Sequence, residues 1–181
     1  MNMTITVHDA FETVREAVEQ ALQQLRKEPH LFQNKTNERS ITHQLAVCLR
    51  DKFEGWDVDC EYNRIGCDSE TITKKILFLE QRQKTVKVDD LEGSRVFPDI
   101  IVHHRGKNEP GDNLLVIEVK TTWGDNDNSK DILKLKAFTG RSPVQQLVSY
   151  KYGLFLRFNE RGAVVKNQEK HFERSAGNQS L

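Results

Sequence analysis

Three residues with the chemistry of a metal site stand in two apolar stretches of the chain. Asp99 directly precedes the apolar residues 100–102. Glu118 and Lys120 end a second apolar run that begins at residue 114. Two carboxylates at one point make a hard oxygen site for Mg²⁺ or Mn²⁺, and such an ion accepts a phosphate oxygen of a substrate. A nearby lysine can orient a water molecule or stabilise negative charge on phosphorus. The residue types therefore predict metal-assisted chemistry on a phosphate.

The spacing of these residues predicts that they lie close together. The apolar stretches 96–102 and 114–119 are typical of central β-strands that are covered on both faces. Side chains two positions apart on a strand point to the same face, so Glu118 and Lys120 share one. If the two strands are neighbours, Asp99 lies beside Glu118. Charged side chains in such strands are costly unless they are paired or bound to a metal. The alternative interpretation is a purely structural ion pair at the strand ends.

The same residues resemble the signature of a nuclease superfamily. A Pro-Asp pair that ends at Asp99 is followed, 19 positions further on, by an acid-x-Lys tripeptide from Glu118 to Lys120. This pattern resembles the PD-(D/E)xK superfamily, the fold of many restriction and DNA-repair endonucleases. The tripeptide alone is weak evidence, so the resemblance depends on the placement of both halves in apolar strands between helices. It covers residues 36–158, and it implies a restriction-endonuclease-like core with a mixed central β-sheet flanked by helices. It also implies that Asp99 and Glu118 hold Mg²⁺ or Mn²⁺ and that Lys120 positions the attacking water.

A further acidic candidate stands at the start of the helix expected before the first strand. The apolar stripe of this helix contains Ile41, Leu45 and Leu49. Glu38 falls on the same stripe, so its carboxylate should point toward the sheet. The first core helix of the superfamily often contributes a Glu to the metal site, and the resemblance implies this role for Glu38. The alternative is that Glu38, in the first turn, only complements the helix dipole.

Four residues are candidates for contact with nucleic acid. Gln146 and Tyr150 match a Gln-x-x-x-Tyr motif of a branch that resembles the nuclease domain of bacterial recombination helicase-nucleases. A spacing of four places both on one face of a short predicted helix. Arg39 and Arg64 are basic residues near the proposed site, and a DNA-cleaving enzyme needs local phosphate contacts of this kind. The alternatives are an incidental surface helix for the first pair and a solvated, charge-balanced face for the arginines.

The elements that must position these residues follow from hydrophobic periodicity and from helix caps. In chain order we expect an N-terminal helix over 9–28, a core helix capped by Thr36 or Asn37, a strand over 56–62, a hairpin or excursion over 63–95, strands over 96–102 and 114–119, a helix over 129–138 capped by Asn128, a short helix from Ser142, strands over 153–158 and 163–165, and a polar tail over 167–181. In the helix 129–138, we expect Asp131 to complement the helix dipole. The alternative is that its side chain reaches the rim of the site. This order predicts an α/β domain with an extra N-terminal helix.

Composition limits the class of protein. A chain of 181 residues predicts a single domain over 1–181. The 27 basic and 27 acidic residues balance to zero net charge, which argues against a simple polycation that binds any nucleic acid. Three cysteines at these spacings support neither a disulfide framework nor a structural zinc site. The sequence contains neither a secretory signal pattern nor a long apolar run, so we expect a cytoplasmic protein without a membrane partner.

Together these features predict a divalent-metal-dependent nuclease that hydrolyses phosphodiester bonds. We expect its substrate to be DNA rather than RNA, and we expect it to act as an endonuclease. Asp99, Glu118 and Glu38 would be neutralised by the metal, so zero net charge is compatible with a nucleic-acid partner. Residues 9–28 precede the region of resemblance and residues 63–95 interrupt it, and we expect these two segments to form a homodimer or to select the substrate. The alternative from another class is a non-catalytic module that keeps the nuclease fold and binds a partner protein or nucleic acid.

Overall fold

The computed structural model describes most of the chain, with gaps. The described residues are 5–6, 8–62, 64–65, 72–73, 97–107, 109, 111–140, 149–165 and 170–173. Their elements, in chain order, are α1 (Phe11–Leu25), α2 (His30–Gln33), α3 (Glu38–Arg50), β1 (Asp57–Cys60), β2 (Arg64–Ile65), β3 (Ile72–Thr73), β4 (Ile100–His103), β5 (Asn113–Thr121), α4 (Ser129–Phe138), β6 (Tyr152–Phe158) and β7 (Lys170–Glu173).

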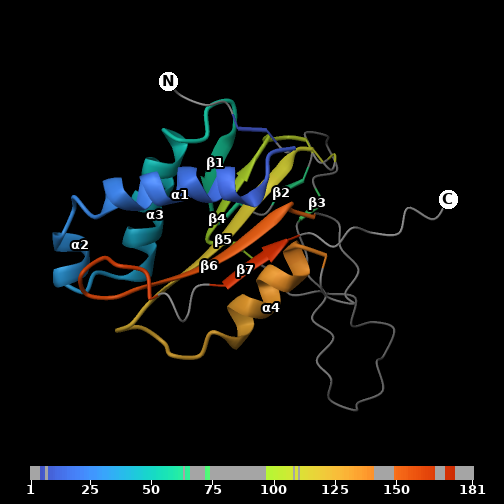
Figure 1. Ribbon diagram of the computed structural model, residues 1–181. Helices are drawn as coiled ribbons and strands as arrows, with labels where there is room; N and C mark the ends of the chain where they lie inside the picture. Colours follow the sequence, from blue (N-terminus) through green and yellow to red (C-terminus); the bar gives the residue numbers. More distant parts are fainter. Residues whose placement is uncertain are drawn as a thin grey trace, which may run out of the picture.

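One mixed sheet organises these elements (Figure 1). Its strand order is β1-β4-β5-β6-β7, and β2 pairs with β3 in a separate two-stranded sheet. β4 is antiparallel to both of its neighbours, β1 and β5. β5 and β6 are parallel, and the helix α4 lies in the crossover between them, as parallel pairing requires. The protein is therefore an α/β fold, as the order of elements in the sequence predicted, and its main sheet is open, five-stranded and mixed.

Helices cover both faces of this sheet (Figure 1). Apolar residues of α1 and α3 pack with one face of β4, β5 and β6 in the larger core cluster, whereas α4 packs on the other face in a smaller one. Every residue of β4 and β6 is buried, and in β5 only Lys120 is partly exposed. The continuous hydrophobicity of these strands thus has the predicted cause, which is cover on both faces. None of the helices that the structure describes has the length and apolar character of a membrane span.

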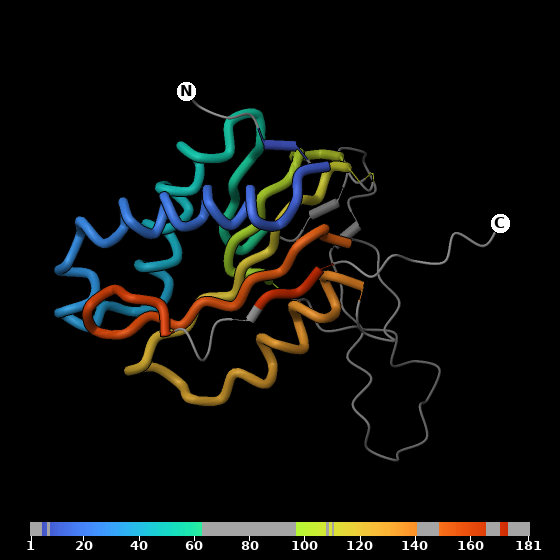
Figure 2. Tube along the Cα trace, viewed as in Figure 1, coloured from blue at the N-terminus to red at the C-terminus, as the bar shows by residue number. Residues whose placement is uncertain are grey.

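The N-terminal helix belongs to the same core. Its trace crosses the sheet near the start of β6, although the two segments are far apart in sequence (Figure 2). The Tyr152 hydroxyl and the Lys151 ammonium donate to the Asp9 carbonyl at 2.9 and 2.7 Å, and the Phe11 and Tyr152 rings lie 5.2 Å apart. The apolar stripe of α1 is buried within this chain. The expected homodimer therefore stays a prediction, and it would have to use another surface.

Several boundaries differ from the sequence-based expectations. α1 ends at Leu25 rather than at 28, and the expected polar link contains the short helix α2. Residues 163–165 form only an isolated bridge, between Val164 and Phe158. The expected polar tail, 167–181, contains the strand β7, which pairs with β6 through its backbone. Among its residues with described side chains, only Phe172 is buried. A single buried side chain is too weak a pattern to reveal a strand. Most of the short helix expected from Ser142 lies outside the described residues.

The edge of the sheet is held by an acidic residue of β1. Arg105 donates to both carboxylate oxygens of Asp59, at 2.6 and 3.0 Å, and His103 Nε2 lies 2.9 Å from Asp59 Oδ2. Burial acts to raise the pKa of Asp59, but the hydrogen bonds from Arg105 and His103 outweigh it and leave this pKa below its ordinary value. The ionised form of Asp59 therefore stabilises the folded state.

This network predicts a pH-dependent stability difference for Asp59→Asn. Near pH 7 we expect the variant to unfold about 1–2 kcal/mol more easily than wild type, because a charge-assisted bidentate contact is lost. The folded pKa of Asp59 is lowered, so its stabilisation is present above the ordinary aspartate pKa of about 4 and disappears as the pH falls through the folded value. Urea unfolding from about pH 7 to about pH 3 measures this difference, which should shrink toward zero at the acid end. Glu54→Gln, at an exposed site before β1, is the matched control, and a difference independent of pH would contradict the assignment.

Candidate active site

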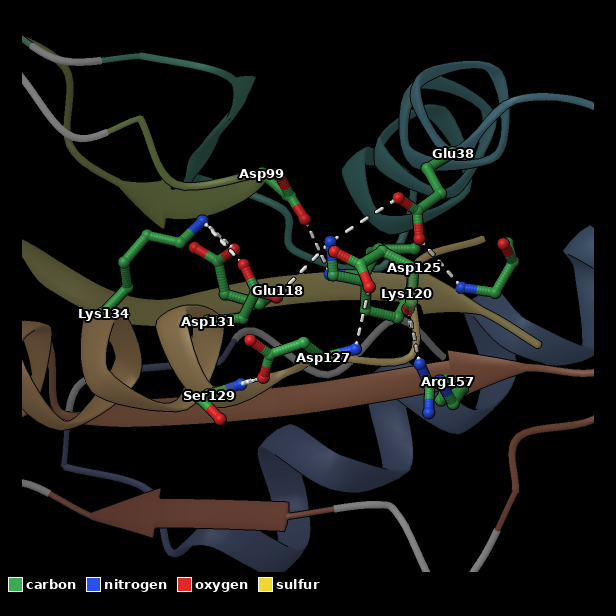
Figure 3. A network of polar contacts seen from close by, with 12 residues as sticks. Glu38, Asp99, Glu118, Lys120, Asp125, Asp127, Ser129, Asp131, Lys134 and Arg157 are labelled. Carbon is green, nitrogen blue, oxygen red and sulfur yellow. Dashed lines mark hydrogen bonds and ion pairs between the residues drawn. The ribbon is translucent and has the colours of Figure 1, made fainter. Parts of the chain in front are cut away.

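The register of β4 and β5 brings two carboxylates together. Ile100 pairs with Ile117 in this antiparallel ladder, so Asp99, just before β4, lies beside Glu118 on β5. The backbone N–H of Val119 donates to Asp99 Oδ2 at 2.7 Å and holds that carboxylate against the strand. The expectation that the two strands are neighbours is confirmed. Figure 3 shows Asp99 and Glu118 with the lysines and acids that surround them.

Glu118 is the most deeply buried member of the site, with a relative exposure of 0%. Its Oε2 forms an ion pair with the ammonium group of Lys134 on α4. Its Oε1 has no hydrogen-bond partner among the described residues. Burial, and then the nearby Asp99 carboxylate, raise the pKa of Glu118 well above its ordinary value despite Lys134. A buried carboxylate oxygen without a donor is costly, and a bound cation removes this cost.

Asp99 shares this environment. Burial raises its pKa above the usual range, although the hydrogen bond from Val119 and the charges of Lys134 and Lys120 act in the opposite direction. The Asp99 carboxylate in turn disfavours the ionised form of Glu118. A fully buried carboxylate and a partly buried one, side by side on two paired strands, form a site of negative potential. Such a site attracts a cation.

Lys120 lies on the same side of β5 as Glu118 and reaches two other acids. Its Nζ is 3.4 Å from Asp131 Oδ2 and 3.6 Å from Glu38 Oε1. Burial acts to lower the pKa of Lys120, but Asp131 and Glu38 outweigh it, so the pKa is raised. Lys120 is therefore protonated at neutral pH. It can donate hydrogen bonds and supply positive charge, but it does not act as a base.

Glu38 reaches the site from α3, as its place on the apolar stripe predicted. α3 begins at Glu38, and the predicted cap is confirmed for Asn37, whose side chain accepts from the Ser40 N–H at 2.8 Å. Glu38 Oε2 accepts from the Thr121 N–H at 2.9 Å, at the end of β5. A Cβ at Gly124 would lie 3.4 Å from Glu38 Oε2, so a small residue keeps the following turn close to this carboxylate. Glu38 thus links the first core helix to the strand that carries Lys120.

α4 supplies two more charged residues to the site. Lys134 Nζ lies 3.1 Å from Asp131 Oδ1, one helical turn before it, and also contacts Glu118 (Figure 3). Asp131 was expected to complement the helix dipole, with a place at the rim of the site as the alternative. The structure places its carboxylate at the site, in contact with Lys120 and Lys134. Sequence reasoning missed Lys134. The signal was present, because 131, 134, 135 and 138 share one face of the helix and two of these positions are charged.

The start of α4 is fixed by acidic residues of the preceding loop. Asn128 occupies the predicted N-cap position, but its side chain makes no capping bond. Instead, Asp127 Oδ1 accepts from the Ser129 N–H at 2.9 Å.

At the other end of α4, a Cβ at Gly153 would lie 2.9 Å from the Thr139 methyl group. Glycine at this position lets α4 approach β6 closely enough for Lys134 to reach the sheet.

Of the four residues predicted to contact nucleic acid, Arg39 and Tyr150 have side chains that the structure describes. Arg39 is exposed and forms an ion pair with Glu61 at 3.1 Å. Tyr150 is fully buried in the smaller core cluster, with its ring edge-on to Phe138 at 5.9 Å, and burial raises its pKa. Arg64 begins β2, and its side chain lies outside the description, as does all of Gln146. Contact of these four residues with nucleic acid stays a prediction.

Six side chains make up what we call the carboxylate–lysine cluster, and their charges do not balance. Its members are Glu38, Asp99, Glu118, Asp131, Lys120 and Lys134. Four carboxylates against two ammonium groups leave two negative charges uncompensated when all six groups are ionised. One divalent cation would neutralise this excess.

The donor set is compatible with Mg²⁺ or Mn²⁺. In the part of the chain that the structure describes, no three His, Cys, Asp or Glu side chains converge as a metal-binding group. Mg²⁺ does not require three, because it usually takes one or two carboxylates and keeps several waters. Asp99 and Glu118 meet this requirement, and the unpartnered Glu118 Oε1 supplies an available ligand atom. We therefore judge that these residues fit a divalent ion, with Glu38 nearby on the other side of Lys120.

Comparison with models of protein families, with curated proteins and with solved structures finds no match to this chain.

Proposed function

We propose that this protein is a divalent-metal-dependent nuclease of the PD-(D/E)xK type that cleaves DNA. The observation that carries the proposal is the meeting of Asp99, Glu118 and Lys120 at the ends of two paired central strands, with a fully buried carboxylate oxygen left without a donor. The order of elements agrees with a restriction-endonuclease-like core. Helix α3, the sheet strands β1, β4 and β5, helix α4 and the strand β6 follow one another along the chain, with the separate pair β2 and β3 between β1 and β4.

Each residue of the site has a task in this function. Asp99 and Glu118 would hold Mg²⁺ or Mn²⁺, which when bound neutralises negative charge that develops on a phosphodiester. Lys120 is held by Glu38 and Asp131, so its ammonium group is oriented before substrate arrives. It would position the attacking water and stabilise charge on the phosphate. Glu38 would position Lys120 and the end of β5 through its two contacts.

An assay of cleavage and of metal binding tests the proposal. Supercoiled, linear and single-stranded DNA are incubated with the protein in Mg²⁺, in Mn²⁺ and in EDTA. We expect cleavage with either metal and none in EDTA, and cleavage of the closed circle would assign an endonuclease. Asp99→Asn should lower the rate by about 100-fold or more, because a ligand of the cation is lost. Titration of Mn²⁺ by calorimetry should show heat of binding for wild type that Asp99→Asn abolishes.

Asp51→Asn is the matched control, because Asp51 is an exposed aspartate at the end of α3. It should leave the rate and the binding heat unchanged. If wild type binds no Mn²⁺ and its cleavage equals that of Asp99→Asn on every substrate, the nuclease function is wrong. DNA binding in a gel-shift assay under those conditions would then favour the non-catalytic module that keeps the same fold.

A further inference from the structure

The carboxylate–lysine cluster contains an internal cation at the place where the proposed function needs an external one. Lys134 pairs with Glu118 Oε2, lies 3.1 Å from Asp131 Oδ1, and has Asp99 among the charges that act on it. Its side chain is only 17% exposed, so the contact with Glu118 is largely screened from water. Among the described residues, no other lysine or arginine contacts Glu118.

We propose that the ammonium group of Lys134 is a built-in competitor of the divalent ion, which holds Glu118 until Mg²⁺ or Mn²⁺ displaces it. The inference rests on the proposed function, and it adds a regulatory role for a residue that the signature motif does not include. A divalent ion bound at Glu118 would lie close to the Lys134 ammonium group, which contacts Glu118 Oε2. Repulsion between two such cations at about 4 Å amounts to several kcal/mol even at an effective dielectric constant of about 20.

The structure also contains a second partner for the displaced lysine. Asp131 stands one helical turn before Lys134, and its side chain is 11% exposed compared with 0% for Glu118. Lys134 can therefore leave Glu118 and keep an ion pair with Asp131, without moving α4. A flexible side chain with one deep and one shallower acidic partner is suited to this exchange.

The competition has a measurable consequence for affinity. A ligand that must expel an internal cation binds more weakly than it would to an empty site, because part of its interaction energy is spent on the displacement. Lys134→Met keeps the aliphatic bulk and removes the charge. We expect its Kd for Mn²⁺, measured by calorimetry, to be about tenfold or more below that of wild type. Lys134→Arg, which keeps the charge, should not tighten binding. Lys136→Met, at an exposed position of the same helix, should bind as wild type does.

A second measurement uses the wild-type protein and does not depend on how well a variant folds. The rate of amine acetylation at each lysine is followed by mass spectrometry, with MnCl₂ or with EDTA. Lys134 should react slowly in EDTA and severalfold faster at saturating Mn²⁺, because its ammonium group is no longer held by Glu118. The peptide that carries Lys136 provides the internal reference.

The outcomes separate this inference from the proposed function. If wild type binds Mn²⁺ through Asp99, but Lys134→Met binds with equal or lower affinity, Lys134 is not a competitor and the nuclease proposal survives. Unchanged reactivity of Lys134 at saturating Mn²⁺ would also overturn the competition. If wild type binds no Mn²⁺ at all, the proposed function fails, and the competition fails with it.

Discussion

Lys120→Met is expected to reduce DNA cleavage by about 100-fold or more, because a charged donor at a reacting phosphate typically contributes at least this factor. The ammonium group of Lys120 is held between Glu38 and Asp131, at 3.6 and 3.4 Å. The substitution retains most of the side-chain volume on β5, so the loss would come from chemistry rather than from packing. Single-turnover cleavage rates at saturating metal measure the effect on the chemical step.

A lysine that serves in catalysis and not in metal binding gives a distinct pattern of results. Lys120→Met should still bind Mn²⁺ in calorimetry, because Asp99 and Glu118 are intact. Lys130→Met provides the control for loss of a positive charge at an exposed site on α4, and it should cleave at the wild-type rate. Equal rates for Lys120→Met and wild type would exclude a role for Lys120 in the reaction and leave it a structural ion-pair partner.

The second large effect concerns stability. Lys134→Met is expected to lower the free energy of unfolding in EDTA by about 2–4 kcal/mol, because removal of one partner leaves the buried Glu118 carboxylate without its cation. Glu118 is fully buried and already has an oxygen without a donor, so the protein cannot compensate by hydration. Unfolding in urea, followed by circular dichroism at neutral pH, measures the loss.

A double-mutant cycle identifies Glu118 as the cause. Glu118→Gln removes the buried charge, so the further substitution Lys134→Met in that background should cost only about 1 kcal/mol or less. The coupling energy between the two positions should therefore exceed about 1 kcal/mol. If Lys134→Met costs the same in both backgrounds, its stabilising role comes from Asp131 or from packing. Saturating Mn²⁺ should restore much of the stability of Lys134→Met, because the ion then supplies the missing charge.

The excess of negative charge in this protein is local rather than global. The chain has no net charge, whereas the carboxylate–lysine cluster has two more acids than bases. The composition therefore provides no overall positive charge that would attract DNA. The proposed function depends instead on contacts of DNA phosphates with one divalent ion and with a few exposed basic residues near the cluster. Arg39 is one such residue, since its side chain is 86% exposed.

The sequence by itself determined the order of the main elements and four members of the cluster. Asp99, Glu118 and Lys120 could be identified because charged residues in apolar strands are rare, and because a spacing of two fixes a shared face. Glu38 could be placed by helical periodicity, since position and face are linked within one helix. These inferences all rest on contacts that are local in sequence or on the pairing of two apolar strands.

Only the tertiary structure decided what surrounds those residues. Lys134 meets Glu118 across 16 positions because α4 packs on the face of β5 that carries the carboxylate, and the closeness of that packing depends on Gly153 in a different strand. The strand β7 likewise forms through backbone pairing with β6, which polar side chains do not reveal. Periodicity reports which side of an element is buried, but the partner that buries it is set by the arrangement of elements in space. That is why the sequence alone could predict a carboxylate pair and a lysine, but not the internal cation that faces them.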